Sequence, residues 1–122
     1  MDPEIIPTDK NYQYFVNLVD ELPPIHEDSI TSRTLFSNDR IKVILFGFAS
    51  GQELSEHTAS VPAIIHILSG EADMILGTER LQAKSGTWAH MPAQLPHSVL
   101  ATTELTMLQL GRHVSPRSRL CL

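Results

Sequence analysis

Two histidines in this sequence stand in segments that combine turn-forming with strand-forming residues. His57 follows Gly51 after five intervening residues, and His97 closes a second segment that begins at Gly86 and contains Pro92. An imidazole can ligate a metal ion or exchange a proton near neutral pH, so these two residues are the first candidates for chemistry. To share one site, they need a fold that brings distant strands together around one pocket, which favours a β-barrel.

The composition narrows the class of protein. The chain has 122 residues, 42% of them hydrophobic and 19% charged, as expected for one globular domain. Its net charge of -5 argues against nucleic-acid binding, which needs clustered Lys and Arg. No apolar run approaches the roughly 20 residues that span a bilayer. The single cysteine, Cys121, cannot form an internal disulfide, and the acidic, proline-broken start is unlike a signal peptide. We therefore expect a cytoplasmic protein without nucleic-acid or membrane partners.

The chain divides into three segments. Residues 1–29 are expected to form an N-terminal arm with a short edge strand or a helical turn, which Pro23 and Pro24 end. Residues 30–111 are expected to be all-β, because short apolar runs alternate with turns rich in Gly, Asn, Asp and Ser. Residues 112–122 form a basic tail, either a frayed end or a segment that docks on the acidic body or a neighbouring subunit. The expected strands lie at residues 32–37, 41–49, 63–69, 72–76, 80–83, 87–91, 97–101 and 105–110.

Two of these expected strands are apolar on both faces. Residues 41–49 read IKVILFGFA, and residues 63–68 read AIIHIL. A strand with one face in water should alternate apolar and polar residues, so both faces of these strands should be covered. In so small a chain the simplest cover is a second subunit, which predicts a homodimer.

The two histidine segments resemble the paired motifs of the cupin superfamily. The first motif runs G-x5-H-x-H-x3,4-E-x6-G and the second G-x5-P-x-G-x2-H-x3-N. The matching positions are Gly51, His57, Gly70, Gly86, Pro92 and His97. The sequence is thus identified as a small single-domain cupin with a degenerate first motif. The resemblance implies a double-stranded β-helix, which is a jelly-roll barrel.

Four positions depart from the two motifs. Ala59 stands in place of the second histidine, Ala63 of the glutamate, Gln94 of the glycine and Ala101 of the asparagine. The resemblance implies a metal held by three histidines and a glutamate in complete members. Here only His57 and His97 remain, and sites for Zn, Fe, Ni or Mn usually need at least three protein ligands.

Two further histidines, His66 and His90, are candidates to complete the set of ligands. If Ala63 faces the interior, as its motif position implies, strand alternation turns His66 outward, and the comparison also turns His90 outward. Three alternatives remain open. In the first, His57 and His97 bind a divalent metal, and His66, His90 or water completes its shell after a β-bulge shifts this parity. In the second, the site is metal-free and His57 and His97 bind a small ligand by hydrogen bonds. In the third, these histidines only pack.

Five other residues are candidate ligand contacts. The resemblance places Phe46, Phe48, Met107 and Gln109 on inward faces, and Trp88 is either a packing residue or part of a cavity wall or dimer contact. A buried amide such as that of Gln109 needs a hydrogen-bond partner, in the backbone or in a ligand. An apolar cavity with a few polar groups is typical of small-molecule sites.

Two functions follow as hypotheses. The first is a metal-dependent enzyme, of the oxygenase or isomerase type, in which His57 and His97 hold the metal and a small organic molecule is the substrate. The second is a metal-free binding or sensor domain for a small ligand. Ala59 and Ala63 favour the second hypothesis, whereas His66 and His90 favour the first.

Overall fold

The computed structural model describes residues 11–112, and nearly all the regular structure within them is β. One 3-10 helix, η1 (Leu18–Glu21), precedes the strands. The strands are β1 (Ile30–Ser37), β2 (Ile41–Phe48), β3 (Glu53–His57), β4 (Ala63–Ser69), β5 (Glu71–Leu76), β6 (Glu79–Lys84), β7 (Trp88–Met91), β8 (His97–Ala101) and β9 (Leu105–Arg112). The predicted all-β class is confirmed.

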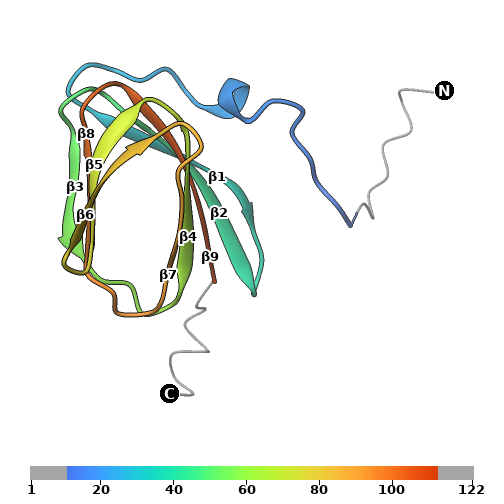
Figure 1. Ribbon diagram of the computed structural model, residues 1–122. Helices are drawn as coiled ribbons and strands as arrows, with labels where there is room; N and C mark the ends of the chain where they lie inside the picture. The colour runs from blue at the N-terminus through green and yellow to red at the C-terminus, as the bar shows by residue number, and fades with distance from the viewer. Residues whose placement is uncertain (1–10, 113–122) are drawn as a thin grey trace.

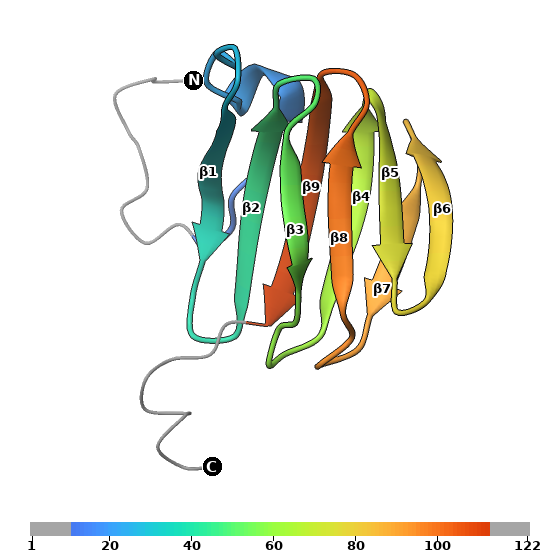
Figure 2. The ribbon, with the colours of Figure 1, turned by 90° about the vertical axis from the view of Figure 1, so that its left-hand side faces the viewer.

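The strands form two antiparallel sheets that enclose one interior (Figures 1 and 2). One sheet has the order β1-β2-β9-β4-β7, and the other has the order β3-β8-β5-β6. Sequence neighbours therefore alternate between sheets at several points, as in a jelly roll, in which two packed sheets share one core. The predicted jelly-roll barrel is confirmed.

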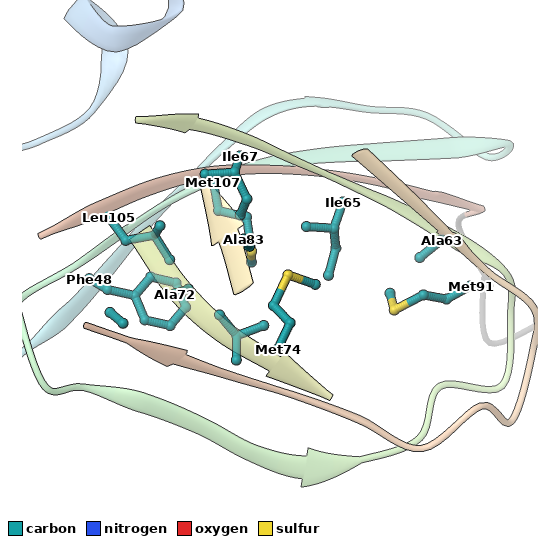
Figure 3. Packing of buried hydrophobic residues seen from close by; sticks show 12 residues of the cluster. Phe48, Ala63, Ile65, Ile67, Ala72, Met74, Ala83, Met91, Leu105 and Met107 are labelled. Carbon is teal, nitrogen blue, oxygen red and sulfur yellow. The ribbon is translucent and has the colours of Figure 1, made fainter. Parts of the chain in front are cut away.

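The core lies between the two sheets and follows strand alternation. In β4 the buried residues are Ala63, Ile65 and Ile67, and in β8 every second residue is likewise buried. Figure 3 shows Ile65 and Ile67 of β4 pointing into the same interior as Met74 of β5, which belongs to the opposite sheet. Each fully buried Leu, Ile, Met, Phe or Val contributes about 1.5–3 kcal/mol by leaving water, so this interior is the main source of stability.

The turn between β4 and β5 depends on its glycine. Gly70 has a φ of +88°, in the left-handed region that side chains disfavour. A Cβ at this position would also collide with the carbonyl oxygen of Glu104, in the turn before β9. Only glycine fits, and this close approach fixes how the two turns pack at that end of the barrel.

The N-terminal arm covers the outer side of β1 and β2. A Cβ built on Gly47 would lie 2.7 Å from Leu22 and 2.8 Å from Ile25, so the arm packs directly on β2. Arg33 of β1 holds the arm in place through an ion pair with Glu21 at 2.9 Å. Within the arm, the structure forms the helical turn η1 rather than the alternative edge strand.

The packing of the arm on β2 corrects the argument that this strand needs a second subunit to cover it. Its doubly apolar sequence was expected to require a second subunit, but Leu45 on its outer face is fully buried within the chain itself, where Leu22 and Ile25 pack on its neighbour Gly47. The apolar outer face of β2 is therefore explained by the arm. Among residues 11–112, no segment covers the outer face of β4 in this way, and the predicted homodimer depends on that strand and its neighbours.

The strand β3 is absent from the strands predicted from the sequence. The segment ELSEH is mostly polar, and four of its five residues are exposed, because β3 is the edge strand of its sheet. Apolar alternation identifies strands only where one face is buried, so it fails here. The omission matters because β3 carries His57.

Candidate functional site

His57 and His97 meet on neighbouring strands at one end of the barrel. They are direct cross-strand partners of β3 and β8. Their ring centroids are 4.2 Å apart and their planes are inclined by 58°. In Figure 2, β3 ends and β8 begins at the lower end of the barrel, opposite the end where η1 lies. Two histidines distant in the sequence thus lie side by side, whereas their shared role as a site stays a prediction.

A β-bulge turns His57 toward His97. Leu54 pairs with Val99 and His57 pairs with His97, so three steps along β3 match two steps along β8. Leu54 packs against the core, and without the extra residue His57 would point to the opposite face of the sheet. The bulge restores it to the side of His97, as bulges near functional sites often re-aim a side chain.

Both imidazoles are held in the same way. Nδ1 of His57 lies 2.8 Å from the carbonyl oxygen of Ser55, and Nδ1 of His97 lies 2.9 Å from that of Leu95. A carbonyl oxygen can only accept, so each Nδ1 must carry the proton that it donates. In the neutral ring this leaves the Nε2 lone pair free, and no hydrogen bond to either Nε2 is formed within residues 11–112. The site therefore offers two oriented lone pairs.

The two rings differ in exposure. His97 is only 5% exposed, whereas His57 is open to solvent at the edge strand. On the facing sheet, Ala63 pairs with Met91, and Figure 3 shows both at one end of the apolar core. The pair thus lies at the boundary between solvent, on the side of His57, and the apolar interior, on the side of His97.

No complete metal shell is assembled by the described chain. Within residues 11–112, no group of three or more His, Cys, Asp or Glu side chains is placed to hold a metal ion. The two motif positions that would supply further ligands carry only the methyl groups of Ala59 and Ala63. The four-ligand metal site implied by the resemblance does not fit these residues, and at most two imidazole nitrogens are available.

The two loops beside the histidines are tied to each other. The backbone N–H of Gln94 donates to the carbonyl oxygen of Ala59 over 2.7 Å, which joins the loop after β3 to the loop before β8. Gln94 has a φ of +69°, the conformation for which the motif's glycine is suited. A non-glycine residue there costs about 1 kcal/mol or more, so this loop is strained.

His66 and His90 lie on the outer face of the five-stranded sheet, away from the barrel interior. Their strand neighbours Ile65, Ala89 and Met91 are buried, so alternation turns both histidines outward, as predicted. No bulge shifts the pairing between β4 and β7. These histidines therefore do not reach His57 and His97, and the expectation that they might complete that site is wrong.

The five predicted ligand contacts occupy different places. Phe48 and Met107 are fully buried in the core, and Phe46 packs beside Phe48 with ring centroids 6.3 Å apart. Gln109 is half-buried and lies on the inward face, two residues beyond Met107. Trp88 is 59% exposed on the outer face, so it forms no wall of the interior. Of the five, Gln109 is the one polar side chain on the inward face, and its contact with a ligand stays a prediction.

Comparisons with known proteins agree with the fold. No family model matches the chain, and no curated protein sequence matches it. Among solved structures, a conserved protein of unknown function from Streptococcus pyogenes is 25% identical, with a TM-score of 0.74 over 93% of this chain and 99% of that chain. A cupin superfamily protein from Desulfitobacterium hafniense is 26% identical, with a TM-score of 0.69 over 73% of this chain and 82% of that chain.

A third solved structure is a cupin 2 conserved barrel domain protein from Leptotrichia buccalis. It is 26% identical, with a TM-score of 0.72 over 80% of this chain and 47% of that chain. The motif spacing, the two-sheet topology and these neighbours lead to one assignment: the chain has the fold of the cupin superfamily proteins to which it is similar. Within residues 11–112 there is no helix long and apolar enough to cross a membrane.

Proposed function

We propose that this cupin binds a small organic molecule at the end of its barrel through the Nε2 atoms of His57 and His97, without a resident metal. The observation that carries the proposal is the fixed orientation of the two rings, 4.2 Å apart, with both Nδ1 atoms engaged by backbone carbonyls. An Nε2 atom that carries no proton accepts hydrogen bonds, so the ligand would present hydroxyl or other N–H and O–H donors.

The surroundings favour a ligand with an apolar body. Ala63 and Met91 at the same end of the core are buried and offer no polar side-chain group. Gln109, on the inward face of β9, would supply a further donor or acceptor. Apolar walls with a few placed polar groups are typical of small-molecule sites.

A second candidate function is metal-assisted binding or catalysis on a small organic substrate, of the oxygenase or isomerase type. The observation in its favour is the same pair of Nδ1–carbonyl hydrogen bonds, because metal-ligating histidines usually donate their other ring N–H in this way. A Zn, Ni, Fe or Mn ion held by two imidazoles would supply Lewis-acid chemistry. The substrate or water would have to complete its coordination.

Metal analysis separates the two candidates. The full chain is purified without an affinity tag or chelator, together with the His57→Ala, His97→Ala double variant. Metal far below one ion per chain in both proteins is expected. A stoichiometric metal that disappears in the double variant would instead support the metal-assisted alternative.

Ligand binding is then tested by NMR of imidazole nitrogens. Small aliphatic and aromatic diols are added to the metal-free protein, and the Nε2 resonances of His57 and His97 should shift, whereas those of His66 and His90 should not. If no diol or other hydroxylated compound of the panel perturbs the inner pair selectively, the metal-free proposal loses its basis.

A further inference from the structure

A hollow of about 610 Å³ lies on the outer face of the five-stranded sheet, where β2 begins and β9 ends. Figure 2 shows the turn between β1 and β2 and the last residues of β9 at the same, lower end of the barrel. The floor of the hollow is apolar, because the strand register aligns Leu110 of β9 with Ile64 of β4. Its volume lies within the usual range of small-molecule sites. We call this hollow the outer groove.

Two arginines lie at one edge of the apolar floor. Arg112 is the last residue of β9 and pairs with Ile41 of β2, so strand alternation places it on the same face as Leu110. Arg40 lies in the turn just before β2 and also lines the groove. Neither guanidinium forms an ion pair within residues 11–112. Both positive charges are therefore available to a ligand.

The turn that carries Arg40 is held by Asn38. The side-chain oxygen of Asn38 accepts hydrogen bonds from the backbone N–H groups of Arg40 and Ile41, each over 2.8 Å. The backbone N–H of Asn38 donates in turn to the carbonyl oxygen of Ile41 over 3.0 Å. Asparagine stabilises tight turns by side-chain bonds of this type. The backbone of Arg40 therefore has a defined place at the edge of the groove.

One acidic residue lies at the same edge. Asp39 lines the groove but pairs with neither arginine in the described part of the chain. Its carboxylate offsets one of the two positive charges, so the edge keeps a net positive charge although the whole chain carries a net charge of -5. His90 lines the groove as well and can add an N–H donor. The edge therefore favours an anionic group over a cationic one.

We propose that the outer groove binds a small carboxylate with an aliphatic body. A guanidinium pairs with a carboxylate through charge-assisted hydrogen bonds that are often bidentate, and Arg40 and Arg112 supply two such groups. The aliphatic body would lie on Leu110 and Ile41, which are 37% and 40% exposed, and would remove their surface from water. Charge and apolar contact are both needed, because each by itself is weak on an open surface.

The outer groove is separate from the His57–His97 site. Those histidines pair across β3 and β8 in the four-stranded sheet, whereas the groove lies on the outer face of the other sheet. Binding of a carboxylate in the groove does not depend on the ligand proposed for the two histidines. Either proposal can therefore fail alone.

NMR titration of the full chain with octanoate tests the proposal. The side-chain N–H signals of Arg40 and Arg112 and the methyl signals of Ile64 and Leu110 should shift together and saturate, while the ring signals of His57 should not follow the same curve. Two matched probes separate the contributions. 1-Octanol lacks the charge and acetate lacks the aliphatic body, so each should bind at least about tenfold more weakly than octanoate.

Substitutions test the same edge. The Arg40→Gln, Arg112→Gln double variant should bind octanoate at least about tenfold more weakly, because both guanidinium groups are lost. The matched control is Arg80→Gln, Lys84→Gln, which removes two positive charges from exposed residues of β6 and should bind as the wild type does. Asp39→Asn should bind octanoate at least as tightly as the wild type, because it removes a like charge.

Circular dichroism checks that each variant is folded. The proposal is overturned if octanoate causes no saturable shift in the groove, if 1-octanol binds equally well, or if the two double variants bind alike. A loss of binding in Asp39→Asn would also overturn it. So would a homodimer, detected by sedimentation of the same sample, that covers the groove and excludes octanoate.

Discussion

The molecule has two pairs of histidines on neighbouring antiparallel strands, and they lie on opposite sides of their sheets. His57 and His97 are direct partners on β3 and β8, and both rings are fixed by backbone carbonyls. His66 and His90 are diagonal neighbours on β4 and β7, and neither ring forms a hydrogen bond within the described residues. The first pair borders the core and the second points out of it.

The difference shows how strand register assigns a role to a residue type. The presence of a histidine does not by itself distinguish metal binding, acid–base chemistry and packing. A bulge in β3 turns His57 toward the interior, whereas the regular pairing of β4 with β7 keeps His66 and His90 outside. Orientation therefore separates a candidate binding site from a candidate interface, although the sequence presents four similar histidines.

The largest expected effect comes from restoring the missing ligand positions beside the inner pair. In an Ala59→His, Ala63→Glu double variant, a carboxylate replaces a methyl group at a site that is 7% exposed, so the metal-free protein should lose several kcal/mol of unfolding free energy. Zn²⁺ should bind about a hundredfold more tightly than to the wild type, which is about 2.7 kcal/mol. Denaturation with and without Zn²⁺, and calorimetric titration, measure both quantities.

The outer pair, His66 and His90, provides the control for this gain in Zn²⁺ affinity. Trp88→His adds a third imidazole next to His66 and His90 on the exposed face, without a buried site to shape the coordination. We expect a far smaller increase in Zn²⁺ affinity than at the inner pair. Equal gains at both pairs would mean that burial and ring orientation do not distinguish them.

A smaller effect is expected from removing single imidazoles. His97→Ala leaves a cavity and an unpaired carbonyl at Leu95 in a place that is 5% exposed, so it should cost about 1–3 kcal/mol of unfolding free energy. His90→Ala removes an exposed ring without hydrogen bonds and should change this free energy of the monomer by about 0.5 kcal/mol or less. Urea denaturation at low protein concentration gives both values. Similar losses would contradict the structural distinction between the pairs.

The smallest effect concerns the strained loop beside the inner pair. Gln94→Gly should raise the free energy of unfolding by up to about 1 kcal/mol, because relief of the left-handed conformation outweighs the added freedom of the unfolded chain. The reverse change at Gly86, with a φ of +96° and open space around it, should cost about 1 kcal/mol as Gly86→Ala. A destabilising Gln94→Gly would show instead that the glutamine side chain stabilises this loop.

Much of the fold could be predicted because it follows from local patterns. All eight expected β-runs correspond to strands, since their apolar residues alternate or their ends are marked by turn residues. The edge strand β3 escaped prediction because it is polar, and polarity at an edge carries no periodic signal. The helical turn η1 was one of two alternatives that its mixed sequence left open.

The candidate site was predictable in part. The spacings that end in His57 and His97 indicated that these two residues meet, and strand parity placed His66 and His90 outside. The ring orientations were not predictable, because they depend on carbonyls brought within 3 Å by the local chain path. The packing of the arm on β2 was not predictable either, because the arm shows no periodicity that indicates where it packs.

The sequence by itself determined the class of fold and the pair of residues at its open end, because glycine, proline and histidine spacings constrain turns and alternation constrains strands. Only the tertiary structure decided how the two imidazoles are oriented and which apolar strand face the arm covers. Those outcomes depend on register, on one bulge and on the packing of the arm. Each joins residues that are distant along the chain, and no local pattern specifies such contacts.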